Sequence, residues 1–254
     1  WSPELKQRAL AANQPTPELP EIALAHRITH GPIFGEERSL WEPSEAVIES
    51  RLELPPELAK ALEPYLGGQS PLKLRTLVHD RGQLDIKLES PPFQADLQDQ
   101  AKVRIPSARG EMYVSAAFDR FRGDLRLPSV EITDPKGEQL RFDQITTGWS
   151  YQRHPKGLWL GETQLRLNGI QGHFAAPGQK DFGLDGLSVT GGVEERGETL
   201  LMQSRMQWGN VKAGDTSFSG GELAMELRNL DTEAFSQLMK EVQNLSRLTA
   251  LDPE

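Results

Sequence analysis

The sequence predicts a mainly β protein, in which a long antiparallel meander forms a curled, groove-like sheet with a few peripheral helices. From about residue 46 to residue 230, apolar and charged residues alternate. In the segment 84–89, for example, leucine or isoleucine occupies every second position and a charged residue follows each of them. Because successive side chains of a strand point to opposite faces, each such strand has one apolar and one polar face. This pattern is typical of antiparallel sheets, since parallel sheets are covered on both faces and read as continuous apolar runs.

The composition agrees with long strands that are buried on one face only. Apolar residues make up 37% of the chain and charged residues 26%, and the mean hydropathy is -0.53. The 18 prolines and 23 glycines lie mostly between the alternating segments, where they indicate turns. A chain of 254 residues is within the range of one large all-β domain, so we expect a single β-rich domain over residues 1–254.

The N-terminal quarter predicts two short helices and two strands. Ser2, Pro3 and Glu4 have the order of a helix start, which predicts a helix near 3–12, followed by a proline-rich linker. We expect strands over 22–30, ending at the Gly31–Pro32 turn, and over 46–54. A second helix is predicted near 56–62, begun by a proline pair and ended by Pro64.

The middle of the chain predicts a succession of strands separated by turn residues. Turn signals include Asp80–Gly82, Arg122–Gly123, Asp134–Gly137 and Arg196–Gly197. The strands are expected near residues 72–79, 83–90, 111–121, 124–133, 139–152, 158–170, 182–193, 198–209 and 215–230.

The last element predicted is an amphipathic helix near 232–249. Asp231 has the character of an N-cap, and Glu233 lies in the first turn, where the helix dipole favours a negative charge. Apolar residues from Phe235 to Leu248 then follow at helical spacing. The polar side of this helix is mixed in charge rather than basic, which argues against a helix on a membrane surface. We therefore expect the helix to cover one end of the sheet as a lid.

Charge and motifs exclude several classes of function. The net charge of -9 repels phosphate backbones, so we expect no nucleic-acid partner. The chain has no cysteine, which excludes disulfides and thiolate metal sites. His26 and His30 are four residues apart on a strand, roughly 13 Å, too far to share one metal ion. No catalytic, cofactor-binding or metal-binding residues are predicted, and we expect the protein not to be an enzyme.

Two stretches carry a resemblance to a known family. The segment from His26 to Pro32, and the segment from Gly221 through Asn229–Leu230–Asp231 into a helix, resemble the YdgA-like proteins of gammaproteobacteria, whose function is unknown. The resemblance implies a periplasmic protein tethered to the inner membrane by an N-terminal helix, of which this chain would be the N-terminal half without its anchor. It also implies an architecture related to the AsmA-like proteins, with an apolar groove.

The leading functional hypothesis is a cell-envelope protein that binds or conducts lipid or acyl chains in this groove. The alternative is a scaffolding module whose partner is an envelope protein or a second copy, as in a homodimer. A hydrolase of envelope polymers would need an acid cluster in a cleft. The residues expected to line the groove are Leu74, Ile86, Leu88, Val114, Phe118, Met202, Met206, Trp208, Leu223, Met225 and Leu227.

Overall fold

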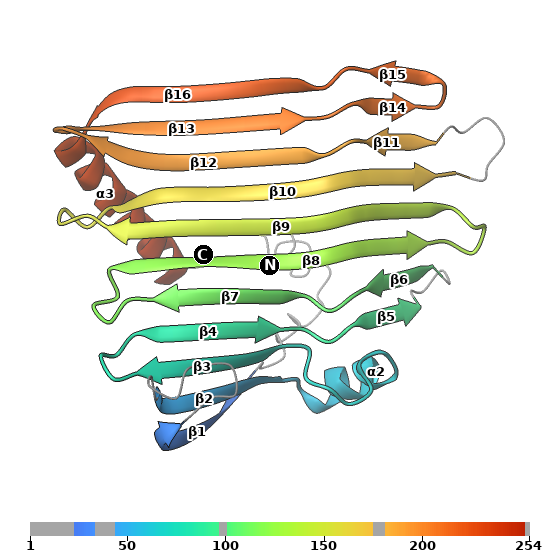
Figure 1. Ribbon diagram of the computed structural model, residues 1–254, viewed down its shortest axis with the longest axis horizontal. Helices are drawn as coiled ribbons and strands as arrows, with labels where there is room; N and C mark the ends of the chain where they lie inside the picture. The colour runs from blue at the N-terminus through green and yellow to red at the C-terminus, as the bar shows by residue number, and fades with distance from the viewer. Residues whose placement is uncertain (1–22, 34–43, 97–100, 175–180, 252–254) are drawn as a thin grey trace.

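The described residues form one open antiparallel sheet of 16 strands, accompanied by two helices (Figure 1). The computed structural model describes residues 23–33, 44–96, 101–174 and 181–251. The elements are β1 Ala23–Ile33, β2 Ser44–Glu53, α2 Pro56–Leu66, β3 Lys73–His79, β4 Leu84–Glu89, β5 Phe93–Asp96, β6 Lys102–Ile105, β7 Arg109–Val114, β8 Arg120–Thr133, β9 Gln139–Arg153, β10 Trp159–His173, β11 Phe182–Leu184, β12 Leu187–Arg196, β13 Thr199–Trp208, β14 Val211–Ala213, β15 Thr216–Phe218, β16 Gly221–Asp231 and α3 Thr232–Leu251. The prediction of a mainly β antiparallel meander with few helices is confirmed.

Most strands pair with their neighbours in sequence, as expected for chains of hairpins. From bottom to top in the left half of Figure 1, the strand order is β1, β2, β3, β4, β7, β8, β9, β10, β12, β13 and β16. Each of these neighbouring pairs is antiparallel. The short strands β5, β6, β11, β14 and β15 extend the sheet at its other end. β1 pairs only with β2 and β16 only with β13, so the described sheet has two free edges.

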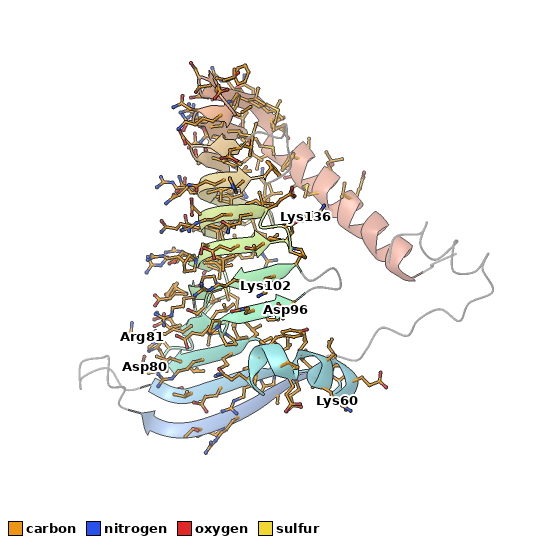
Figure 2. All side chains as sticks on the ribbon, turned by 90° about the vertical axis from the view of Figure 1, so that its right-hand side faces the viewer. Lys60, Asp80, Arg81, Asp96, Lys102 and Lys136 are labelled. Carbon is orange, nitrogen blue, oxygen red and sulfur yellow. The ribbon has the colours of Figure 1, made fainter. Side chains whose placement is uncertain are left out.

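The strands stack in a single layer (Figure 2). Helix α3 leaves the last strand and runs along one side of the sheet, diverging from it, while nitrogen and oxygen atoms gather on the other side (Figure 2). Side chains that are almost fully buried occur at the end where α3 begins: Leu200, Leu201, Thr232 and Ser236. Other buried residues lie on β2, α2 and β5, such as Val47, Leu66 and Ala95. The described part of the chain therefore has small buried regions and no second layer over most of the sheet.

Several predicted boundaries are wrong, and the largest error concerns β7 and β8. Arg122–Gly123 is not a turn, because it lies inside β8 and pairs with β7 on one side and β9 on the other. The turn lies at residues 115–119, where Phe118 has a φ of 55°. Ser115 organises this turn: its hydroxyl donates to Asp119 Oδ1 over 2.6 Å and accepts the backbone N–H of Arg120 over 3.0 Å. Phe118 therefore does not lie on a strand.

Other differences come from breaks and continuations that local sequence does not reveal. The predicted strand 182–193 is divided at Asp185–Gly186 into β11 and β12, and the predicted strand 215–230 is divided into β15 and β16. The strands β5, β6 and β14 were not predicted. Helix α2 passes through Pro64 and ends at Leu66, where Gly67 adopts the left-handed conformation. β1 continues through Gly31–Pro32 to Ile33 with an irregular register. The predicted helix near 3–12 lies outside the described residues.

Helix α3 begins where the sequence predicts and is fastened to the sheet at its first turn. The backbone N–H of Ala234 donates to Asp231 Oδ1 over 2.8 Å, which confirms Asp231 as the N-cap. Thr232 Oγ1 donates to the Glu198 carbonyl over 2.9 Å, and Ser236 Oγ donates to the Lys156 carbonyl over 2.7 Å. These bonds hold the helix to the β12–β13 and β9–β10 turns.

Replacing Asp231 by alanine should lower the free energy of unfolding by about 1 kcal/mol, because the N–H of Ala234 loses its acceptor. Asparagine keeps a side-chain oxygen at this position, so Asp231→Asn should change stability by less than roughly 0.5 kcal/mol. Urea unfolding followed by far-ultraviolet circular dichroism measures both. Equal losses in the two variants would show that the cap does not stabilise the helix.

Candidate functional site: the apolar face of the sheet

The register of the strands places apolar side chains from all parts of the chain on one side of the sheet. Because directly opposed residues of paired strands share a face, three rows can be followed from β3 to β16. We call the surface made by these three rows, and by the row next to them from Leu127 to Gly221, the apolar face. The three rows are Leu74, Leu88, Gly110, Leu125, Thr147, Leu165, Val189, Met206 and Leu223; Thr76, Ile86, Met112, Gly123, Trp149, Thr163, Gly191, Ser204 and Met225; and Val78, Leu84, Val114, Phe121, Tyr151, Gly161, Val193, Met202 and Leu227.

The three rows contain no charged side chain. Their polar groups are hydroxyls, and the closest pair of these is satisfied internally, since Tyr151 Oη and Thr163 Oγ1 are hydrogen bonded at 2.6 Å. Four of the five methionines of the chain lie in these rows: Met112, Met202, Met206 and Met225. Methionine is unbranched and polarisable, so a surface rich in it adapts to ligands of varying shape.

Two tryptophan rings lie close to glycines of the neighbouring strand. A Cβ built on Gly123 would come within 2.7 Å of the Trp149 ring, and one built on Gly221 within 2.4 Å of the Trp208 ring. At Gly123 the backbone oxygen of Glu111, 2.5 Å from such a Cβ, excludes a side chain as well. The close approach of neighbouring atoms therefore requires glycine at both positions. The arrangement keeps the indoles close to the backbone and the apolar face shallow at these points. Phe121, Tyr151 and Trp159 form an aromatic cluster nearby, with ring centres 5.3 and 4.9 Å from that of Phe121.

Much of this surface is open to solvent. At β16 the side chains of Leu223, Met225 and Leu227 are 61, 59 and 46% exposed, and in the middle of the sheet Leu165 is 39% exposed. The facing helix α3 also leaves apolar side chains exposed, namely Leu238, Met239 and Val242. Exposed apolar surface of this extent indicates an interaction site.

Ten of the eleven residues expected to line a groove share the apolar face. Nine lie in the three rows, and Trp208 lies in the adjoining row between Leu187 and Gly221. The exception is Phe118, which lies in the β7–β8 turn and is 61% exposed. Residues of the central strands β9, β10 and β12, such as Trp149, Leu165 and Val189, were missed as lining residues, although the same alternation marks them.

The opposite side of the sheet is charged, and we call it the charged face. Its central row runs through Arg75, Lys87, Glu111, Asp124, Gly148, Gln164, Thr190, Arg205 and Ala224. Two hollows, of about 890 and 400 Å³, are lined mainly by residues of this face and of the adjoining turns. Acids of the larger hollow have partners: Asp119 accepts from Ser115, and Glu195 lies 3.0 Å from His154.

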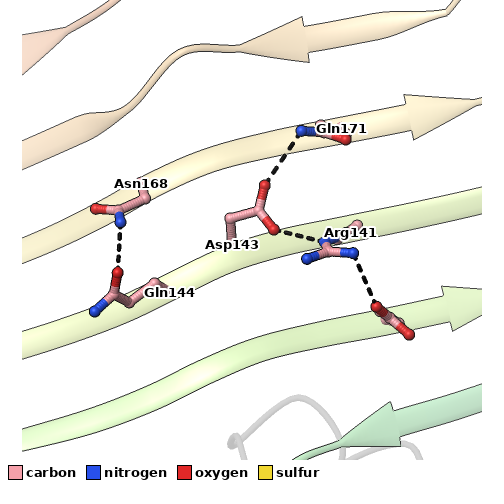
Figure 3. Close-up of polar contacts among 6 residues, drawn as sticks. Arg141, Asp143, Gln144, Asn168 and Gln171 are labelled. Atoms are coloured by element: carbon pink, nitrogen blue, oxygen red, sulfur yellow. Dashed lines mark hydrogen bonds and ion pairs between the residues drawn. The ribbon is translucent and has the colours of Figure 1, made fainter.

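A polar network crosses β8, β9 and β10 on the sheet (Figure 3). Arg141 Nε donates to Asp143 Oδ1 over 2.5 Å, and its Nη1 lies 3.2 Å from Glu131 Oε1. Gln171 Nε2 donates to the other oxygen of Asp143 over 3.3 Å, and Asn168 donates to Gln144 over 2.6 Å. The hydrogen bond to Asp143, and then the charge of that carboxylate, raise the pKa of Arg141. These exposed contacts connect neighbouring strands but bring no nucleophile and base together.

The chemistry of the described residues offers little besides apolar contact. They contain no group of three or more His, Asp or Glu side chains placed to hold a metal ion. Within the same residues, neither helix has the length and apolar character needed to cross a bilayer. His26 pairs with Ser50 at 2.8 Å, and His79 with Asp85 at 2.9 Å.

Comparison with known proteins gives one family. A family model described as a bacterial protein of unknown function, DUF945, matches residues 4–254. Neither the curated proteins nor the solved structures give a match.

Proposed function

This chain belongs to DUF945, a bacterial family of unknown function, and from that premise we propose that it is a non-enzymatic protein that holds lipid acyl chains on its apolar face. The observation that carries the proposal is the set of three rows without a charged side chain across nine strands. Protein interfaces ordinarily carry polar groups that form about one hydrogen bond per 100–200 Å². An acyl chain needs none, which matches a surface whose few polar groups are hydroxyls.

The dimensions of the apolar face also suit acyl chains. Nine strands at about 4.8 Å spacing extend over roughly 38 Å, longer than the ~30 Å hydrocarbon core of a bilayer. Three rows two residues apart give a width of about 14 Å. A lipid tail, which spans half of that core, therefore fits across the strands with its full length in contact.

The side chains of the face support a ligand of variable length and saturation. The methionines on β7, β13 and β16 can change conformation at low energetic cost. The exposed apolar side chains of α3, on the same side of the sheet (Figure 2), would contact a bound chain from the opposite direction.

The place of action follows from the resemblance to the YdgA-like proteins. We propose that the protein works in the periplasm, tethered to the inner membrane, where diacyl lipids are the abundant source of acyl chains. The alternative of a scaffolding role is favoured by a different feature, the free edge of the sheet at β16.

Leu165→Asp should reduce lipid binding at least tenfold, because it places a carboxylate in the middle of the apolar face, where a bound acyl chain would remove its water. The probe is phosphatidylethanolamine with palmitoyl and oleoyl chains, supplied in detergent micelles, and native mass spectrometry measures the bound fraction. Leu165 is 39% exposed, so the variant should remain folded, as circular dichroism will show.

The matched control is Arg166→Asp, the next residue of β10, whose side chain points to the charged face. It introduces the same group on the other side of the sheet and should leave lipid binding within twofold. An unmodified chain that carries no lipid adduct, or equal losses in both variants, would rule out the apolar face as the lipid site.

A further inference from the structure

The outer edge of β16 is a long strand edge that no described element covers. In Figure 1, β16 is the outermost long strand, and α3 turns back behind the sheet rather than along this edge. Residues 222–229 are all exposed. Such an edge presents unpaired backbone N–H and C=O groups, and proteins usually protect it with charged side chains, above all lysine, with prolines or with short strands. β16 carries three charged residues over 222–228 but no lysine. β16 has eleven residues and no proline.

We propose that this edge pairs with β16 of a second copy, antiparallel and centred on Met225, so that two sheets join into one. The proposal is independent of lipid binding. A two-fold axis perpendicular to the sheet through Met225 places Leu223 opposite Leu227 of the second copy. It thereby joins the apolar faces of both copies on one side.

Charge selects this register over its neighbours. Centred on Met225, the pairing places Glu222 opposite Arg228 of the other copy, twice per dimer. Centred on Ala224, it would oppose Glu222 to Glu226, and centred on Glu226 it would oppose that acid to itself. Like charges directly opposite on a sheet are destabilising. A slip by one residue would set the apolar row against the charged row.

The present partners of these charges are compatible with the pairing. Glu222 accepts from Gln207 over 2.8 Å and lies 3.3 Å from Arg205, both on β13. Arg228 pairs with Glu226 of its own strand. All four charged side chains are at least 37% exposed, so they can turn toward a second copy without leaving a buried charge. The register with β13 shifts between Leu227 and Leu230, and Asn229 in this interval has a φ of 58°. The regular part of the edge therefore ends at Leu227, and Arg228 is the residue that follows it.

The other free edge does not offer an equal partner for β16. Along the strand order, β1 and β16 occupy the first and eleventh positions of an alternating sheet and therefore run in the same direction. If β1 of one copy paired with β16 of another, with the apolar faces on one side, the two strands would be parallel. Such pairing would build an open-ended fibre rather than a closed dimer.

Met225→Cys tests the register directly, because the chain has no other cysteine. At the two-fold axis the two Cα atoms would be about 4.5–5.5 Å apart, within the range of a disulfide. We expect mild oxidation to convert the variant into a covalent dimer. Leu223→Cys is the control: its two copies would be about 13 Å apart along the strands and should remain unlinked. An equal mixture of Leu223→Cys and Leu227→Cys chains should cross-link.

The second measurement is the molecular mass in solution, determined by sedimentation, of variants in which the charges of β16 are exchanged. The unmodified chain should sediment as a dimer, Arg228→Glu should weaken the dimer at least tenfold, and Glu222→Arg combined with Arg228→Glu should restore it. A monomer in sedimentation without cross-linking of Met225→Cys would overturn the proposal. Cross-linking of Leu223→Cys alone in place of Met225→Cys would also overturn it, as would a disulfide formed only with a different protein in a bacterial extract.

Discussion

Leu200→Asp is expected to lower the free energy of unfolding by about 4 kcal/mol or more, because it buries an unpaired carboxylate and leaves a cavity. Leu200 is 0% exposed and lies on β13 in the small core beneath the start of α3. Neighbouring groups of this core, such as Leu201 and Ser236, are also nearly inaccessible. At this exposure the new carboxylate would have no contact with water.

Ile28→Asp on β1 is the matched comparison. Ile28 is an apolar residue of a strand, like Leu200, but it is 52% exposed. The aspartate would remain hydrated, so its cost should be limited to the lower strand propensity, about 1 kcal/mol. Urea unfolding of both variants, monitored by circular dichroism and by tryptophan fluorescence, measures the difference. Similar losses at the two sites would mean that the end core does not stabilise the fold more than the rest of the sheet.

Gly161→Ala should destabilise the protein by about 3 kcal/mol, through backbone strain. Gly161 is the third residue of β10. It has a φ of 147°, and a Cβ at this position would come within 1.9 Å of the Ser150 carbonyl oxygen and 2.8 Å of Tyr151 Cα. Because these are backbone atoms of the paired strand β9, relief requires that the two strands separate. The measurement is the urea midpoint together with the slope of the transition.

Gly191→Ala provides the contrast for this prediction. Gly191 lies on β12, also on the apolar face, and the nearest atom to a Cβ there is the Gln203 carbonyl oxygen at 3.9 Å. Alanine should be accommodated and should change stability by less than about 1 kcal/mol, in the stabilising direction. Equal destabilisation of both variants would show that loss of glycine in the sheet, rather than the contact with Ser150, is responsible.

The sequence predicts the two faces of the sheet well because, within a regular stretch of strand, the face of a residue depends only on its parity. Leu74, Met206 and Leu223 are far apart in the chain, yet the register of the strand pairs places all three in one row of the apolar face. Strand order was also accessible, since adjacent strands in an antiparallel meander are mostly consecutive.

Glycine explains the main errors, because one residue type serves two purposes. The sequence predicts a turn at Gly123, whereas this residue is the fourth of β8 and lies against the ring of Trp149. A turn and a close approach by a ring both require the absence of a side chain, and they cannot be distinguished without the partner strand. The prediction placed Phe118 on a strand for the same reason, since a turn at 122–123 extends the preceding strand through it.

Tertiary features were not predictable from the alternation alone. In the long strands β8, β9 and β10 the apolar positions change from odd to even numbers beyond Pro128, Gln144 and Asn168, and Gln144 has a φ of 30°. Nothing local to Gln144 signals this change of phase. Likewise, alternation shows that a face is apolar but not whether another layer covers it.

The single-layer arrangement determines how stability is distributed through the molecule. Each long strand is held chiefly by the two strands beside it, so the free energy of the fold approximates a sum of nearest-neighbour terms, as in repeat proteins. Strands in the middle, such as β9 and β10, can open only after those outside them have separated, while β1 and β16 each give up one partner. Order is then expected to be lost from the margins inward. A ligand or second copy bound at an edge strand would therefore be expected to stabilise the whole sheet.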